Sequence, residues 1–162
     1  MGWSQGAFLA GNFALNNPQI TDKVILVSMK EKYDQSGLDR IKGYLEKNKN
    51  VYLYKFYMEC FSGEDKKHWL WFKENLLKDY IDNLGIEELA AGLDRISESE
   101  IKTQLLNNIK NLIIVHGQKD KIAPLEEIIY MKDKLPGAQF FHFKDAGHLP
   151  FLNEDLGNIL HD

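Results

Sequence analysis

Gly2-Trp3-Ser4-Gln5-Gly6 opens the chain and has the Gly-x-Ser-x-Gly spacing of a nucleophile elbow. This sharp strand-to-helix turn lifts a serine hydroxyl clear of its own backbone, and the flanking glycines remove Cβ atoms that would collide there. We therefore expect a helix over residues 4–16 with Ser4 at its N-terminus. The simpler alternative is that Ser4 only caps this helix.

Two strand-then-loop signals late in the chain supply the other groups that a nucleophilic serine needs. Asp120 follows the apolar run 112–115, and His148 follows the run 139–144. The chain order Ser, Asp, His is that of α/β-hydrolases and differs from the trypsin and subtilisin orders. His116 is an alternative base, although its position at the end of a strand favours His148.

Together these residues predict acyl transfer through an acyl-enzyme. Ser4 would attack an ester carbonyl, His148 would take and return the proton, and Asp120 would hold the imidazole. The backbone N–H of Gln5, at the helix N-terminus, would support the oxyanion. No metal or organic cofactor is implied, because no His and acid spacing in the chain is typical of a metal site.

The motifs resemble the α/β-hydrolase superfamily, and within it the serine carboxylesterases with a helical lid. The similarity is strongest to the family of pimeloyl-acyl-carrier-protein methyl ester esterases. It lies in four stretches: Gly2-Trp3-Ser4, Phe56 with Gly63 after it, Leu89 to Leu93 with Gly92, and Asp145-Ala146-Gly147-His148. The resemblance implies a small ester substrate, free or bound to an acyl carrier. It implies that the acyl chain is bound by Trp3, Phe56, Tyr57 and Cys60, although the aromatic residues are equally explained as the core of the lid.

The same triad also serves other reactions. A thioesterase, a lipase or a C–C bond hydrolase would need the same three residues, and the shape of the acyl pocket decides among them. A third hypothesis is an inactive truncated chain that folds without a complete oxyanion hole.

Hydrophobic periodicity predicts an α/β fold with about three parallel strands and a helical insertion. The strands are expected at 24–28, 112–115 and 139–144, in a core formed by residues 1–29 and 105–162. Residues 30–104 contain no convincing strand and are expected to form a helical lid. Its helices are predicted near 39–48, 51–61, 66–83 and 87–96. Further helices are expected over 124–135 and 153–160.

The chain is similar to only the later half of the superfamily's fold. The loop that normally supplies the second oxyanion donor follows an earlier strand and has no counterpart here. Strand 24–28 would then present an unpaired apolar edge, which favours association. We therefore expect a homodimer through this exposed strand, most simply a twofold one.

Composition narrows the range of partners and compartments. The 162 residues carry a net charge of −4, with Lys and Arg spread along the chain. Nucleic acid and anionic membranes are therefore not expected as partners. No apolar run approaches the ~18 residues that a membrane span needs. The single cysteine, Cys60, indicates a reducing compartment, so we expect a cytoplasmic protein.

Overall fold

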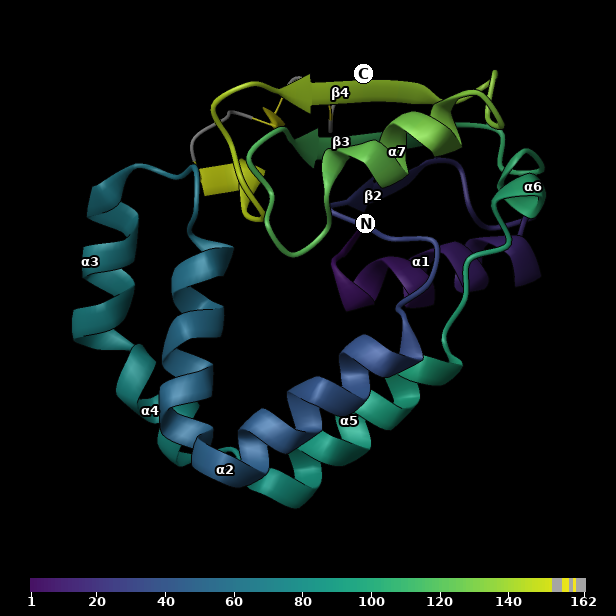
Figure 1. Cartoon of the computed structure of the whole chain (residues 1–162). Coiled ribbons are helices and arrows are strands. Elements are labelled where there is room, and N and C mark those ends of the chain that lie inside the picture. Colours follow the sequence, from purple (N-terminus) through teal and green to yellow (C-terminus); the bar gives the residue numbers. More distant parts are fainter. Residues whose placement is uncertain (153–155, 158, 160–162) are drawn as a thin grey trace.

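A four-stranded parallel sheet forms the centre of the molecule. The computed structural model describes residues 1–152, 156, 157 and 159. The strands lie in the order β1-β2-β3-β4 and comprise Gly2–Trp3, Val24–Val27, Leu112–Gly117 and Gln139–Phe143. All three neighbouring pairs are parallel, so the carboxyl ends of the strands meet at one edge of the sheet, which lies to the left in Figure 1. The predicted α/β class with parallel strands is confirmed.

The prediction of three strands was one too few. Gly2 pairs with Leu26 and Trp3 with Val27, which adds β1 beside β2. Two residues are too short for any periodicity to reveal a strand. This pairing also corrects the expectation that strand 24–28 forms an exposed edge: β2 ends at Val27, all four of its side chains are buried, and β1 lies outside it.

The two central strands carry continuous apolar runs, residues 24–27 and 112–115, because both faces of the sheet are covered. Leu26 and Ile114 belong to a core that packs under three helices: α1 (Gln5–Asn16), α6 (Thr103–Leu106) and α7 (Leu125–Lys132). Val27 and Val115 alternate to the opposite face, where they pack with Leu156 and Ile159. The continuous hydrophobic runs therefore correctly indicated buried parallel strands.

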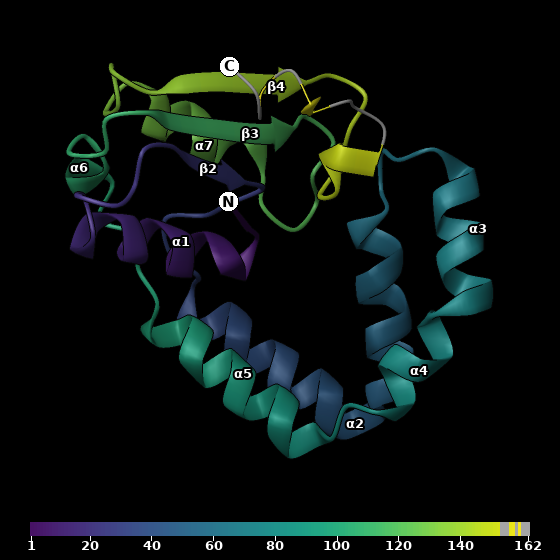
Figure 2. The same ribbon diagram turned by 180° about the vertical axis from the view of Figure 1, so that it is seen from behind.

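Four helices between β2 and α6 extend away from the sheet as two arms (Figures 1 and 2). They are α2 (Gln35–Cys60), α3 (Lys66–Asn75), α4 (Leu77–Asp82) and α5 (Ile86–Glu98). The first half of α2 packs along α5, and its second half runs beside α3 and α4. The views show both arms on the same side of the sheet layer.

Local signals explain where these helices bend. The expected break between residues 48 and 51 is a kink inside α2, where Asn48 has φ −163° and its side chain accepts a hydrogen bond from the Val51 N–H. The single helix expected over 66–83 is divided into α3 and α4, because Leu76 leaves helical geometry with φ −126°.

The remaining expectations on secondary structure have mixed outcomes. The one-turn helix α6 was not predicted, and a 3-10 helix spans Pro150–Leu152. The helix expected over 153–160 falls largely on residues outside those described. Within the described part of the chain, no helix has both the length and the apolar character that crossing a membrane requires.

Candidate active site

Ser4 lies in the turn between β1 and α1 and has an unusual backbone. Its φ of 52° and ψ of −122° are rare for a residue with a Cβ. The Ser4 N–H donates to the Val27 carbonyl oxygen at 2.8 Å, so pairing with β2 continues into the turn and holds this conformation. Strain of this kind persists only where surrounding contacts fix it, and it is common at active sites.

The two glycines of the motif have different environments. A Cβ on Gly2 would lie 2.3 Å from the Gly6 carbonyl oxygen and 2.7 Å from the Ala10 Cβ, so the first turns of α1 require glycine here. A Cβ on Gly6 would meet nothing within 4 Å. The expectation that both flanking glycines avoid a collision therefore holds for Gly2 and is wrong for Gly6.

The structure brings Ser4, His148 and Asp120 together although they lie far apart in sequence. Ser4 Oγ is 2.9 Å from His148 Nε2, and His148 Nδ1 is 2.8 Å from Asp120 Oδ2. The Ser4 side chain makes no capping hydrogen bond to α1, so the alternative that Ser4 only caps this helix is wrong. Because a carboxylate only accepts, His148 donates from Nδ1, and Nε2 accepts the Ser4 hydroxyl proton.

Asp120 is held by its own loop after β3. Its Oδ1 accepts the backbone N–H groups of Ile122 at 2.8 Å and Ala123 at 2.9 Å. Its Oδ2 remains for His148, so both oxygens of this buried carboxylate have partners. Such a group orients the imidazole and stabilises its protonated form.

His116 supports the acid loop and does not reach Ser4. It is fully buried, and its Nε2 donates to the Ala123 carbonyl oxygen at 2.7 Å. Burial lowers the pKa of His116 below its ordinary value, so the neutral imidazole is favoured. His116, the alternative base, is therefore held within the acid loop by its hydrogen bond to Ala123.

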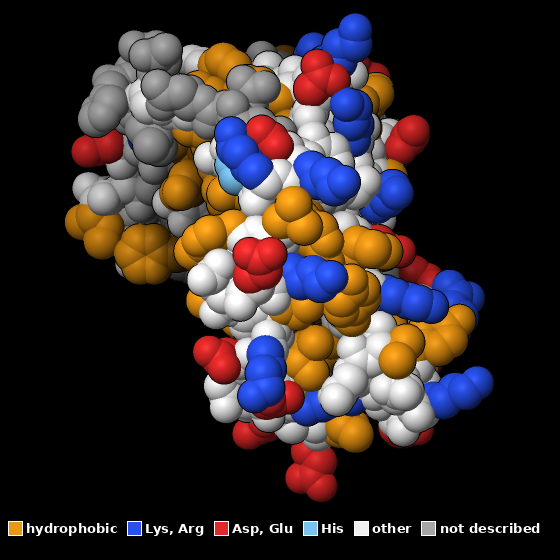
Figure 3. Space-filling view, turned by 90° about the vertical axis from the view of Figure 1, so that its left-hand side faces the viewer, with side chains coloured by type: hydrophobic (Ala, Val, Ile, Leu, Met, Phe, Trp, Pro, Cys, Tyr) orange, Lys and Arg blue, Asp and Glu red, His pale blue; other side chains and the backbone are white. Residues whose placement is uncertain are grey.

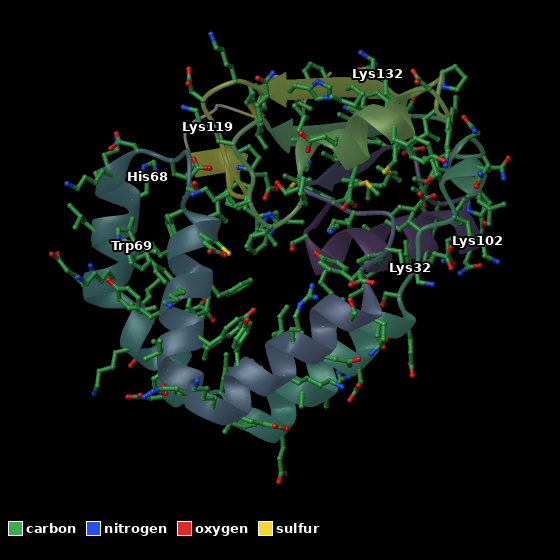
Figure 4. The ribbon with its side chains drawn as sticks, viewed as in Figure 1. Lys32, His68, Trp69, Lys102, Lys119 and Lys132 are labelled. Carbon is green, nitrogen blue, oxygen red and sulfur yellow. The ribbon has the colours of Figure 1, made fainter. Side chains whose placement is uncertain are left out.

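His148 is positioned by contacts from Trp3 and from the turn between α2 and α3. The Trp3 indole Nε1 donates to the His148 carbonyl oxygen at 2.8 Å, and the two rings lie 5.4 Å apart. In the same loop, the Gly147 N–H donates to Glu64 Oε1 at 2.8 Å, where Glu64 belongs to the turn between α2 and α3. This turn also contacts the acid loop, since a Cβ on Gly63 would lie 2.8 Å from the Lys119 Cβ. Figure 4 shows Lys119 above the end of α2 and His68 at the beginning of α3.

The sequence-predicted oxyanion donor, Gln5, lies directly after Ser4. It is the first residue of α1, so its N–H has no acceptor within the helix. Tyr33 lies in the connection between β2 and α2, and burial raises its pKa to about 12.

The predicted acyl-binding residues lie in two different places, beside the site and within the arms. Trp3 lies against His148, as described above, and is 40% exposed. Cys60 is buried at the end of α2, and burial together with the neighbouring Asp120 raises the pKa of its thiol to about 12. Phe56 and Tyr57 instead join an aromatic cluster within the arms, where the Tyr57 ring lies 5.4 Å from Phe72.

A groove lies on the arms and away from Ser4. It has a volume of about 510 Å³ and lies between α2, α3 and α4. Its apolar lining includes Val51, Tyr54 and Leu77, and its lysines are Lys55, Lys73 and Lys78. Figure 3, viewed from the side of α3, shows apolar side chains exposed among lysines on this part of the molecule. In the part of the chain that the structure describes, no three or more His, Cys, Asp or Glu residues gather as metal ligands would.

Comparison with known families agrees with this geometry. The sequence model of the family described as the alpha/beta hydrolase fold matches residues 1–155. The chain belongs to the α/β-hydrolase family. In α/β-hydrolases the order Ser, Asp, His along the chain is the order found here for Ser4, Asp120 and His148.

Curated relatives of this α/β-hydrolase are named as esterases. It is 26% identical to the pimeloyl-[acyl-carrier protein] methyl ester esterase of Nitrosomonas europaea, over 94% of this chain and 64% of the relative. It is 24% identical to the protein of the same name from Vibrio parahaemolyticus, over 95% of this chain and 64% of that protein. The chain thus spans just under two thirds of the length of these relatives.

Solved structures show the same fold. An esterase from Exiguobacterium antarcticum superimposes with a TM-score of 0.76 at 19% identity, covering 97% of this chain and 62% of the esterase. An esterase from Thermogutta terrifontis superimposes with a TM-score of 0.69 at 22% identity, covering 98% of this chain and 60% of that protein. The α/β-hydrolase fold of this chain is therefore supported by sequence and by structure.

Proposed function

We propose that this α/β-hydrolase is a serine carboxylesterase in which Ser4 is the nucleophile. The observation that carries the proposal is the hydrogen-bonded series from Ser4 Oγ to His148 and on to Asp120. The names of the curated relatives support ester hydrolysis as the reaction.

In the first half of the reaction, Ser4 Oγ forms a bond to the ester carbonyl carbon, and its proton passes to His148 Nε2. Asp120 stabilises the imidazolium through Nδ1–H, and the Gln5 N–H donates to the oxyanion. The carbon–oxygen bond to the alcohol then breaks, and the alcohol leaves with the proton from His148. An acyl-enzyme on Ser4 remains.

In the second half, water replaces the alcohol. His148 takes a proton from the water, whose oxygen bonds to the acyl carbon, and then returns the proton to Ser4 Oγ as the carboxylic acid leaves. None of these steps requires an oxidant or a reductant.

We further propose that residues 30–104 act as a lid over an acyl-binding site, with residues 1–29 and 105–162 as the catalytic core. The turn that carries Gly63 and Glu64 supports this, because it contacts both the Asp120 loop and the His148 loop. Trp3 and Cys60, beside His148 and Asp120, are the stronger candidates for contact with the acyl chain. Phe56 and Tyr57 would shape the site from within the lid.

The substrate we propose is a short or medium acyl ester, free or carried by an acyl-carrier protein. The carrier-bound form rests on the printed name of the relatives. Hydrolysis of a pimeloyl methyl ester, compared with the same ester linked to an acyl carrier, tests this directly. Faster turnover of the linked ester supports a carrier partner, and equal turnover contradicts it.

The nucleophile is tested by intact-mass spectrometry of the full chain before and after a fluorophosphonate probe. A single adduct that is lost in Ser4→Ala supports the proposal, and a Ser28→Ala variant is the matched control because Ser28 is fully buried at the end of β2. The absence of an adduct on a chain shown to be folded by circular dichroism contradicts the proposal and favours an inactive chain.

Two further expectations stay predictions. The homodimer was expected through strand 24–28, but β1 lies outside that strand and takes its place as the edge on this side of the sheet. Sedimentation at micromolar concentration distinguishes monomer from dimer. The cytoplasmic location rests on the lone Cys60 and is tested by cell fractionation.

A further inference from the structure

Glu64 lies in the turn between α2 and α3, and this turn has a defined shape. Gly63 before it has a φ of +94°, a left-handed conformation that glycine adopts readily and other residues adopt rarely. Asp65 after it caps α3, because its side chain accepts the Lys67 N–H at 3.0 Å. Glu64 is therefore held between a fixed reversal of the chain and the N-terminal cap of a helix.

The Glu64 side chain joins the helical arms to the loop that carries His148. Its Oε1 accepts the Gly147 N–H at 2.8 Å, although the two residues are 83 positions apart in the sequence. Figure 1 shows the connection between α2 and α3 beside the carboxyl ends of the strands. A hydrogen bond from a peptide N–H to a carboxylate is stronger than one between neutral groups. The arms thus hold the residue directly before His148.

The Gly147 backbone is enclosed between the core and the arms. On the core side, a Cβ on Gly117 at the end of β3 would lie 2.2 Å from the Gly147 carbonyl oxygen. On the arm side, a Cβ on Gly63 would lie 2.9 Å from the Gly147 nitrogen. This close packing limits how far the loop can move toward either side, and the hydrogen bond to Glu64 sets the orientation of the peptide.

His148 is therefore held on both sides of its own backbone. Glu64 binds the N–H of the preceding residue, and the Trp3 indole donates to the His148 carbonyl oxygen at 2.8 Å. The imidazole Nδ1 is bound to Asp120, which is fixed by its own loop. Because Nδ1 is anchored, a shift of the His148 backbone turns the ring about this nitrogen and moves Nε2 relative to Ser4 Oγ.

We propose that Glu64 is a positioning residue, which holds the His148 imidazole within the distance of Ser4 that proton transfer requires, about 2.6–3.2 Å. Its carboxylate acts on the peptide before His148 and not on the substrate. Because Glu64 belongs to the turn between α2 and α3, His148 is fully positioned only while this turn is seated on the His148 loop. The catalytic base thus depends on a region that contributes none of the three triad residues. This inference rests on the proposed esterase activity.

The test compares three substitutions of Glu64 in the full chain, with hydrolysis of a p-nitrophenyl ester as the assay. Glu64→Ala removes the acceptor, Glu64→Asp shortens its reach by one methylene, and Glu64→Gln keeps a carbonyl oxygen at the same reach. We expect kcat to fall by about 10²-fold in Glu64→Ala, as for a misplacement of ~1 Å, with little change in KM. Glu64→Asp should fall similarly, and Glu64→Gln should stay close to wild type.

Glu59→Ala is the matched control, because Glu59 lies at the same end of α2 and its side chain is exposed. It should match wild type in kcat and KM. A second readout separates positioning from a loss of structure. The NMR proton resonance of His148 Nδ1–H should persist in Glu64→Ala, because Asp120 still accepts this proton, while kcat falls.

Other outcomes overturn the inference. Wild-type kcat in Glu64→Ala shows that His148 needs no contact from the arms, and an equal loss in Glu64→Gln assigns the effect to charge instead of to the hydrogen bond. Loss of the Nδ1–H resonance assigns Glu64 to the folding of the site as a whole. If Glu64→Ala does not fold, Glu64→Asp is compared with Glu64→Gln, and equal kcat values overturn the inference. Wild type that neither hydrolyses the ester nor reacts with a fluorophosphonate refutes the esterase proposal, whereas active wild type with unaffected Glu64→Ala refutes this inference alone.

Discussion

The steric difference between the two elbow glycines gives a sharp prediction for a pair of alanine variants. In Gly2→Ala, the new methyl group would lie 2.3 Å from the Gly6 carbonyl oxygen, about 1 Å inside ordinary van der Waals contact. Both neighbours, the Gly6 carbonyl oxygen and the Ala10 Cβ, are fixed parts of α1, so the helix itself must move. Overpacking of this kind costs about 1–3 kcal/mol of the free energy of unfolding.

The same displacement should reduce reactivity at Ser4. Ser4 immediately precedes α1, so a shift of the helix by about 1 Å changes the 2.9 Å contact between its Oγ and His148 Nε2. A misplacement of ~1 Å in a catalytic group can lower a rate by ~10²-fold. We therefore expect Gly2→Ala to form the fluorophosphonate adduct about 10²-fold more slowly than wild type.

Gly6→Ala is the matched control. Its Cβ would meet nothing within 4 Å, and alanine in a helix is about 0.5–1 kcal/mol more favourable than glycine. We expect a slightly higher free energy of unfolding in a denaturant titration, with an unchanged labelling rate. If Gly2→Ala labels as fast as wild type, or if both variants lose reactivity equally, the steric account of the elbow is refuted.

Three other predictions concern the groups around the site. Burial holds the pKa of His116 below 6.5, so the unfolded chain binds a proton that the folded chain does not. The free energy of unfolding, measured in denaturant titrations, should therefore fall from about pH 7.5 to about pH 5.5. The free energy of unfolding of His116→Gln should fall less over the same range. The Cys60 thiol is 5% exposed, and its pKa is raised to about 12. It should therefore resist iodoacetamide in the folded chain and react once guanidinium unfolds the chain. Modification of Cys60 in the folded chain would contradict its burial. Asp120→Asn should lower kcat by about 10⁴ without loss of fold, because an amide does not hold the same imidazole tautomer; a loss below tenfold would argue against its role.

Much of the fold could be predicted because each signal was local. Continuous apolar runs indicated β2 and β3, and Asn48 was close to the expected break between two helices of the lid region. The two-residue strand β1 could not be recognised, since it exists only through pairing with Leu26 and Val27. The same missing pair led to the wrong expectation that strand 24–28 forms an exposed edge.

The residues of the site also divide into those that the sequence could predict and those that it could not. Ser4, Asp120 and His148 could be proposed from the sequence because each follows a strand, and parallel strands bring their carboxyl ends to one edge. Glu64 could not, because its contact depends on how the connection between α2 and α3 folds back on the His148 loop. Neither hydrophobic periodicity nor the spacing of motifs predicts how a long connection folds back on the site.

The contacts of the turn between α2 and α3 link the helical arms to the reactivity of His148. Gly147 has no room for a side chain, since its Cβ would lie 1.6 Å from the Ser62 carbonyl oxygen, and its N–H is bound to Glu64. His148 follows directly, and its Nε2 is the atom that must stay within hydrogen-bond distance of Ser4. A displacement of the arms would therefore pull on the loop that positions the base, while Asp120 stays fixed by the N–H groups of its own loop. It follows that movement of the arms should change the Ser4 to His148 contact before it changes the contact between His148 and Asp120.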